Sequence, residues 1–186
     1  MLKSSFFTVD ERLEKLSDQA LAEIAPRFAA IDEVTEYNQQ KVLRAFIDHQ
    51  VSETHFATGY GYGDRGRDTL DQVFAQVMGA EDALVRHSIV SGTHAITIAL
   101  SGVLRPGDTL LAATGAPYDT LEKVIGIRGD APGSLREFGI HYEQVDLDDQ
   151  GHPRISAIVD ALTDAVKVVH IQRSRGYDPR PSLRVE

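Results

Sequence analysis

The sequence predicts an α/β protein with a mainly parallel β-sheet, helices on both faces of that sheet, and helices preceding it at the N-terminal end. Short apolar runs alternate with amphipathic helical patterns between about residues 83 and 171. The connections between the runs are long enough for the helical crossovers that parallel strands need. The chain has 186 residues, 42% of them hydrophobic and 25% charged, which is enough for a domain with its own core.

The N-terminal region is helical in pattern from about Val9 to His49, where apolar residues recur in broken stripes. Proline removes a helical hydrogen bond, so we expect two helices here with a break near Pro26 or Asp32. A glycine-rich stretch, 58–67, follows and is expected to be an extended arm. We assign residues 1–58 to an N-terminal helical segment and residues 59–186 to an incomplete cofactor-binding α/β domain.

The remaining elements follow from periodicity and from glycine or proline at their ends. A helix is expected to end at Gly79, as glycine-capped helices do. The elements expected after it are a strand at 83–90, a helix at 94–104, a turn at 105–108, a strand at 109–113, a helix at 118–126, a strand at 140–145, a helix starting at Pro153 and a strand at 166–171. The sequence then stops without a closing element, so we expect an incomplete catalytic domain.

Ser91-Gly92-Thr93 lies between an apolar run and a helical pattern. The free amides of a first helical turn and the positive end of its dipole favour a phosphate there, and glycine allows close approach. The alternative is that Ser91 or Thr93 only caps the helix. Both interpretations place this motif at the edge of the sheet where the carboxyl ends of parallel strands bind ligands.

The glycine-rich stretch contains Gly61-Tyr-Gly-Asp-Arg-Gly66, whose residues match the G-x-G-x-x-G pattern of a dinucleotide-binding fingerprint. That fingerprint requires a strand directly before it, and the preceding pattern is helical and polar. Instead, Arg65 and Arg67 could hold a phosphate, with a hydroxyl from Tyr60 or Tyr62. The alternative is a surface loop with solvated charges.

Two further positions lie at the same edge of the predicted sheet. The ring of Tyr118, which begins a helix, could cover a planar cofactor, although a packing role is the alternative. The guanidinium groups of Arg173 and Arg175, in the loop after the last strand, could hold a substrate carboxylate. The alternative for that loop is simple exposure to solvent.

Composition excludes several classes of function. The chain has no cysteine, so disulfides, thiolate zinc sites and a cysteine nucleophile are ruled out. Its seven histidines form no His-x-x-x-His pair, and we expect no metal. The net charge of −9 argues against nucleic-acid or anionic-membrane partners. No apolar stretch is long enough for a membrane span and the N-terminus lacks a signal-like core, so a cytoplasmic location is expected.

Taken together, several motifs in order resemble the methionine gamma-lyase-like, aluminium-resistance family of pyridoxal-phosphate enzymes. The resemblance covers the chain from about residue 10. The motifs that carry it are Gly59-Tyr-Gly-Tyr62, Gly66-Arg-Asp-Thr-Leu70, Ser91-Gly-Thr-His-Ala-Ile96, Pro117-Tyr-Asp-Thr-Leu-Glu122 and Gln172-Arg-Ser-Arg-Gly-Tyr177.

The resemblance implies an aspartate-aminotransferase-like fold (fold type I), a homodimer or tetramer, and carbon–sulfur bond cleavage in a sulfur-containing amino acid. By the family's pattern, Ser91, Gly92 and Thr93 hold the phosphate of pyridoxal 5′-phosphate and Tyr118 stacks on its ring. Tyr60 or Tyr62, with Arg67, reaches the phosphate of a neighbouring subunit.

The sequence departs from the family in one respect. The Schiff-base lysine and the aspartate that faces the pyridine nitrogen would fall beyond Glu186, and none of the lysines present suits that role (Lys3, Lys15, Lys41, Lys123 and Lys167). We therefore expect the N-terminal part of a carbon–sulfur lyase, inactive by itself. The alternatives are a non-catalytic phosphate-binding or oligomerisation module and an ordinary Rossmann nucleotide-binding domain.

Overall fold

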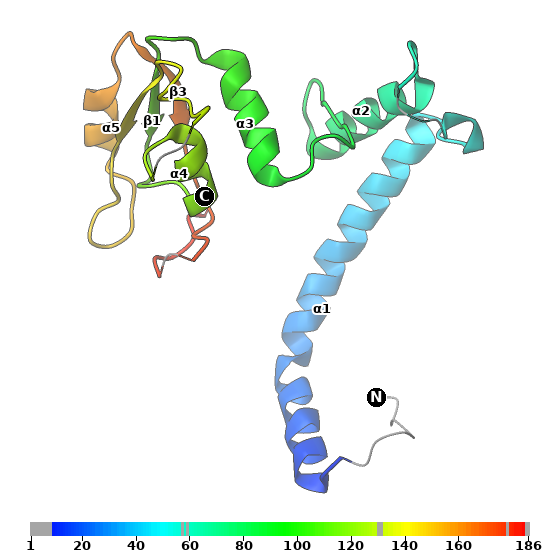
Figure 1. The fold of residues 1–186 in the computed structure, drawn as a ribbon. Coiled ribbons are helices and arrows are strands. Elements are labelled where there is room, and N and C mark those ends of the chain that lie inside the picture. Colours follow the sequence, from blue (N-terminus) through cyan, green and yellow to red (C-terminus); the bar gives the residue numbers. More distant parts are fainter. Residues whose placement is uncertain (1–8, 57, 59, 130–131, 178, 185–186) are drawn as a thin grey trace. The chain divides into compact units, whose positions relative to one another are not determined.

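The computed structural model describes residues 9–56, 58, 60–129, 132–177 and 179–184. The chain forms two compact units, Met1–Arg86 and His87–Glu186 (Figure 1). The boundary predicted from sequence, between residues 58 and 59, lies inside the first unit. Each unit is described by itself below.

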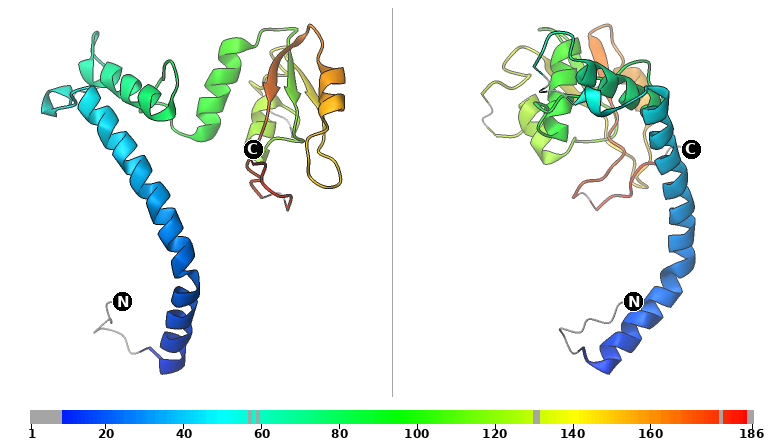
Figure 2. Two further views of the ribbon diagram at one scale, coloured as in Figure 1. Left: turned by 180° about the vertical axis from the view of Figure 1, so that it is seen from behind. Right: turned by 90° about the vertical axis from the view of Figure 1, so that its right-hand side faces the viewer.

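The first unit begins with α1, one helix of 38 residues from Glu11 to Asp48. Asp10 caps it by accepting a hydrogen bond from the Arg12 amide at 2.8 Å. The predicted break is wrong, because Pro26 lies inside the helix. A proline removes one hydrogen bond and bends a helix, while the turns on either side keep their own bonds. Figure 2 shows the resulting curvature of α1.

A 3-10 turn, η1 (Glu53–His55), and the helix α2 (Arg65–Met78) complete the regular structure of this unit. Asp64 caps α2 by accepting from the Arg67 amide at 3.0 Å. A side chain at position 66 would place its Cβ 1.9 Å from the carbonyl oxygen of His55, so only glycine fits there. The predicted glycine end is confirmed, since Gly79 adopts the left-handed conformation with φ 67°.

The glycine-rich arm is shorter than expected, because α2 starts at Arg65 and takes in the last part of it. The expected strand at 83–90 is also wrong: the described residues there form no ladder. The Val85 amide donates to Asp71 Oδ1 at 2.7 Å, and the Arg86 guanidinium pairs with the same carboxylate. The backbone donor that a sheet partner would use is thus taken by a side chain.

The second unit contains a parallel sheet of three strands in the order β2-β1-β3, which confirms the predicted α/β class. Its elements are α3 (Gly92–Val103), β1 (Thr109–Ala112), α4 (Asp119–Ile125), β2 (His141–Gln144), α5 (Ile155–Ala161) and β3 (Val166–His170). The strand order sends the two crossovers in opposite directions, and right-handed crossovers then put their helices on opposite faces. Accordingly, α3 and α4 lie together on one side of the sheet, and α5 lies on the other side (Figures 1 and 2).

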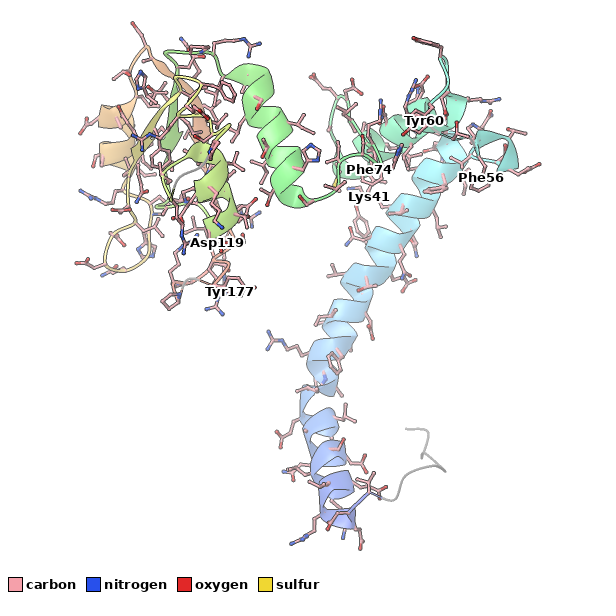
Figure 3. All side chains as sticks on the ribbon, viewed as in Figure 1. Lys41, Phe56, Tyr60, Phe74, Asp119 and Tyr177 are labelled. Atoms are coloured by element: carbon pink, nitrogen blue, oxygen red, sulfur yellow. The ribbon has the colours of Figure 1, made fainter. Side chains whose placement is uncertain are left out.

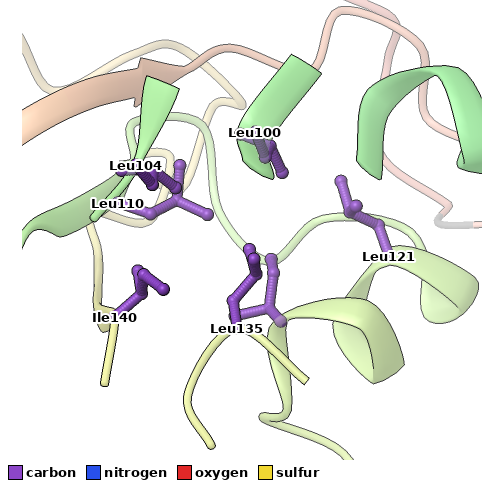
Figure 4. Close-up of a cluster of buried hydrophobic side chains, with 7 residues drawn as sticks. Leu100, Leu104, Leu110, Leu121, Leu135 and Ile140 are labelled. Carbon is purple, nitrogen blue, oxygen red and sulfur yellow. The ribbon is translucent and has the colours of Figure 1, made fainter. Parts of the chain in front are cut away.

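The core of this unit fills the face covered by α3 and α4 (Figure 4). Its buried residues are Leu100, Leu104, Leu110, Leu121, Ile125, Leu135 and Ile140. Gly126 ends α4 with φ 90°, and a Cβ there would lie 2.4 Å from Ser134 Oγ, so glycine is required for the return of the chain over the core. Among the described residues, no helix is long and apolar enough to cross a membrane.

Candidate functional site

Ser91 starts α3 and acts as its cap. Its backbone is extended, with φ −161° and ψ 165°, and its Oγ accepts a hydrogen bond from the His94 amide at 3.1 Å. Ser91 therefore caps the helix, and the phosphate contact expected of it stays a prediction. This cap occupies the hydroxyl of Ser91 and leaves the two amides ahead of His94 for another partner.

Those two amides, of Gly92 and Thr93, have no acceptor among the residues that the structure describes. Gly92 is exposed, and a Cβ placed on it would meet nothing within 4 Å. Unpaired amides at the positive end of a helix dipole form a binding surface for an anion. The first turn of α3 is therefore open rather than covered by packed side chains.

Three hydroxyl groups meet beside this turn. Tyr118 donates from its hydroxyl to Thr93 Oγ1 at 3.2 Å, and Thr93 Oγ1 lies 3.0 Å from Thr120 Oγ1. Tyr118 and Thr93 are predicted site residues, whereas Thr120 is not. The sequence does contain a signal for Thr120. A polar β-branched residue two positions after Tyr118, at a predicted helix start, is expected to lie close to the same edge of the sheet.

The other end of Tyr118 is held by Gln172. The Tyr118 amide donates to Gln172 Oε1 at 2.9 Å, and the Gln172 amide donates to Thr114 Oγ1 at 2.9 Å. Thr114 follows β1 and Gln172 follows β3, so the carboxyl ends of two adjacent parallel strands meet here, as predicted. Gln172 belongs to the motif at 172–177 but has no role predicted from the sequence.

A pocket of about 350 Å³ opens beside Tyr118. Figure 3 shows Asp119 and Tyr177 together at this end of the unit. The full lining is Ala116, Pro117, Tyr118, Asp119, Glu122, Arg128, Gln172, Arg175 and Tyr177. It contains both signs of charge: Arg128 pairs with Glu122 at 3.3 Å, whereas Arg175 pairs with none of the described residues.

The two arginines predicted to bind substrate occupy different surroundings. Arg175 lines the pocket. Arg173 lies outside that lining, and its Nε donates to the carbonyl oxygen of Leu183 at 3.4 Å. A guanidinium beside a pocket can take a carboxylate as a two-pronged partner, so Arg175 is the better placed of the two.

The predicted arm residues belong to the other unit. Tyr60 and Tyr62 are exposed, and Gly59 of the same motif lies outside the described residues. Arg67 sits in the first turn of α2, with its Nη1 donating to the Gly61 carbonyl at 3.4 Å. The contact of these residues with a cofactor phosphate stays a prediction. The dinucleotide interpretation is wrong, since η1 and no strand precedes Gly61 in the described part of the chain.

A second pocket, of about 440 Å³, lies at the opposite end of the sheet beside Tyr142. Burial, with smaller contributions from the Glu122 and Asp146 carboxylates, raises the pKa of Tyr142 to about 12. Its hydroxyl stays protonated and donates to Gln144 Oε1 at 2.7 Å. Over the described residues, no group of three or more histidine or carboxylate side chains is placed to hold a metal.

Comparison with known proteins gives a consistent set of relatives. The sequence profile of the family described as methionine gamma-lyase matches residues 13–186. The chain is 50% identical over 181 residues to the uncharacterized protein YnbB of Bacillus subtilis (strain 168). This match covers 96% of the chain and 43% of YnbB.

Solved structures agree with this. A Clostridium acetobutylicum protein, provisionally named as a cystathionine beta-lyase involved in aluminium resistance, matches with a TM-score of 0.87 and 48% identity over 95% of this chain and 43% of its own. A carbon–sulfur lyase involved in aluminium resistance from Clostridium novyi NT matches with a TM-score of 0.82 and 49% identity, over 89% of this chain and 41% of its own. The chain thus spans less than half the length of these relatives.

Proposed function

Because the chain belongs to the methionine gamma-lyase family, we propose that it provides the phosphate-binding and ring-covering parts of a pyridoxal-phosphate-dependent carbon–sulfur lyase with an aspartate-aminotransferase-like fold. The observation that carries this proposal is the open first turn of α3, where two amides with no acceptor among the described residues lie beside three converging hydroxyls. The names of the solved relatives support a sulfur-containing amino acid as substrate.

The residues present fit the cofactor in charge and in chemistry. The amides of Gly92 and Thr93 would bind the phosphate dianion, helped by the dipole of α3. The hydroxyls of Thr93 and Thr120, which lie 3.0 Å apart, would donate to the same group. Tyr118 would cover the pyridine ring, with its orientation fixed at the hydroxyl and at the backbone amide. Bound pyridoxal phosphate would supply the electron sink for the reaction.

Substrate recognition falls to the loop after β3. Arg175, which has no partner among the described residues, would hold the carboxylate of the amino acid through its guanidinium. Asp119 and Glu122 line the same pocket and would repel a second carboxylate. We propose that this arrangement orients the amino acid with its carboxylate toward the loop.

No lysine among the described residues lies at this site. In the described residues, Lys15 and Lys41 lie on α1 and Lys123 on α4, and Lys167 donates to the Asp164 carbonyl at 2.7 Å. None of them lines the pocket beside Tyr118. We therefore propose that these 186 residues bind the cofactor but do not release a thiol by themselves.

The first unit would serve assembly. Within α1, Ala45 is the only buried residue of the described helix, and large apolar side chains such as Phe28, Ile31 and Val34 are about half exposed or more. Apolar surface of this kind is typical of protein interfaces. We propose a homodimer or tetramer in the cytoplasm, in which Tyr60 or Tyr62 with Arg67 reaches the phosphate of a neighbouring copy.

The test of the proposed function compares two probes that lack the reactive aldehyde. 4′-Deoxypyridoxine 5′-phosphate should bind to the 186-residue chain in calorimetric titration, and 4′-deoxypyridoxine without the phosphate should bind at least about 30-fold more weakly, because it loses the charged contacts with α3. Equal binding of both probes, or binding of neither, would contradict the phosphate site. Thiol release from cystathionine by this chain would contradict the proposal that these 186 residues do not catalyse the reaction by themselves.

A further inference from the structure

We propose that Gln172 is a positioning residue that fixes the ring of Tyr118 relative to the loop carrying Arg175. This inference rests on the proposed function, because it assigns Gln172 a role toward the same bound cofactor. Gln172 does not line α3 and would not touch the phosphate. It acts through the backbone of Tyr118 on one side and through the loop after β3 on the other.

Gln172 joins three segments of the chain through hydrogen bonds. Its Oε1 accepts from the Tyr118 amide at 2.9 Å, and its Nε2 donates to the Ser174 carbonyl at 3.0 Å. Its backbone amide donates to Thr114 Oγ1 at 2.9 Å, and Thr114 is buried behind β1. The side-chain amide therefore connects the start of α4 with the turn that leads to Arg175.

The position of Tyr118 explains why this bond matters. Tyr118 is the residue before α4, and it has no side-chain capping hydrogen bond of its own. Without Gln172 its backbone amide would have no protein acceptor in this arrangement. The backbone of Tyr118 would then be held from the α4 side, where its carbonyl accepts from the Leu121 and Glu122 amides at 2.9 and 3.1 Å, and its ring by the 3.2 Å bond to Thr93. A residue whose backbone is held on the helix side alone can shift and turn its ring, whereas the bond to Gln172 holds the Tyr118 backbone on the other side as well.

The loop side of the connection is reinforced by a second residue. Arg180 Nη2 donates to the carbonyl oxygens of Gln172 and Ser174 at 3.1 and 3.0 Å. The turn that carries Arg175 is thus held by both a neutral amide and a guanidinium. Gln172 also accepts a hydrogen bond from the Tyr118 amide, so it sets the distance between the ring of Tyr118 and the substrate carboxylate.

The experiment uses the full 186-residue chain and three variants of one position. Gln172→Leu removes both side-chain hydrogen bonds with similar volume, and Gln172→Glu keeps the acceptor for the Tyr118 amide. Each protein is titrated with 4′-deoxypyridoxine 5′-phosphate and, separately, with inorganic phosphate. The induced circular dichroism of the pyridine absorption band reports the fixed orientation of the ring, and Gln172→Asn, with its shorter side chain, serves as a matched control.

We expect Gln172→Leu to lose most of the induced dichroism and to bind the pyridine probe about fivefold more weakly, as for the loss of the one neutral hydrogen bond that acts on Tyr118. Its affinity for inorganic phosphate should be unchanged, which a general loss of folding would not allow. Gln172→Glu should restore the dichroism, and Gln172→Asn should not.

Two results would overturn the inference, and they differ. If the unmutated chain does not bind the pyridine probe, the proposed function and this inference both fail. If it binds, but Gln172→Leu keeps the full induced dichroism or loses affinity for both ligands equally, the cofactor site stands and the positioning role of Gln172 is wrong.

Discussion

Substituting Ser91 with aspartate is the most direct test of the open helix start. Aspartate is as good a helix cap as serine, so the bond to the His94 amide, 3.1 Å in the present structure, should persist. The substitution adds one negative charge next to the amides of Gly92 and Thr93. At about 4 Å, each pair of unit charges repels by roughly 1 kcal/mol even at the dielectric constant of water. A phosphate dianion would therefore lose about 2 kcal/mol, or roughly 30-fold in affinity.

The matched control is Ser91→Asn, which also caps a helix but carries no charge. Calorimetric titration of 4′-deoxypyridoxine 5′-phosphate should give nearly equal affinities for the serine and asparagine proteins and a much weaker one for the aspartate protein. The difference should shrink at higher ionic strength, since these exposed charges are screened. Equal affinity of the aspartate and asparagine variants would refute the reasoning that a dianion lies against this turn.

Three further predictions concern stability. Leu121→Ala, at a site with no exposed surface, should lower the unfolding free energy by about 2–5 kcal/mol in urea titration, and a loss below 1 kcal/mol would mean that α4 does not close the core. The hydrogen bond from Arg86 holds the pKa of Asp71 below its ordinary value. The stability that the Asp71 carboxylate contributes is therefore present above about pH 4 and is lost as the pH falls through the lowered pKa. Asp71→Asn should flatten this acid dependence of stability in thermal melts. The pKa of Tyr142, raised to about 12, gives stability that is present below about pH 10 and lost as the pH rises toward 12, so Tyr142→Phe should resist alkaline unfolding better than the unmutated chain.

Most elements of the second unit could be predicted from the sequence because their signals are local. The helix after Ser91 shows its cap and its apolar periodicity within a dozen residues, and the glycines at 107 and 126 mark the ends of a turn and a helix. Parallel strands that alternate with helices then follow from the lengths of the connections. The elements between Gly92 and His170 accordingly match the prediction to within a few residues.

The errors came from features that depend on partners distant in the sequence. The run at 83–90 has the apolar composition of a strand, but pairing needs a neighbouring strand, and Asp71 takes the Val85 amide instead. Proline at position 26 was expected to end a helix, although a long helix can bend and continue through it. The hydrogen bond between Tyr118 and Gln172 joins residues 54 positions apart, and no local pattern indicates such a pair.

The bare backbone at Gly66 governs how the chain enters α2. His55 and Gly66 approach so closely that even a methyl group would overlap the carbonyl oxygen of the 3-10 turn. A larger residue would push that turn aside, and with it the short connection that presents Tyr60 and Tyr62. The absence of a side chain at Gly66 thus determines where the exposed rings of Tyr60 and Tyr62 lie.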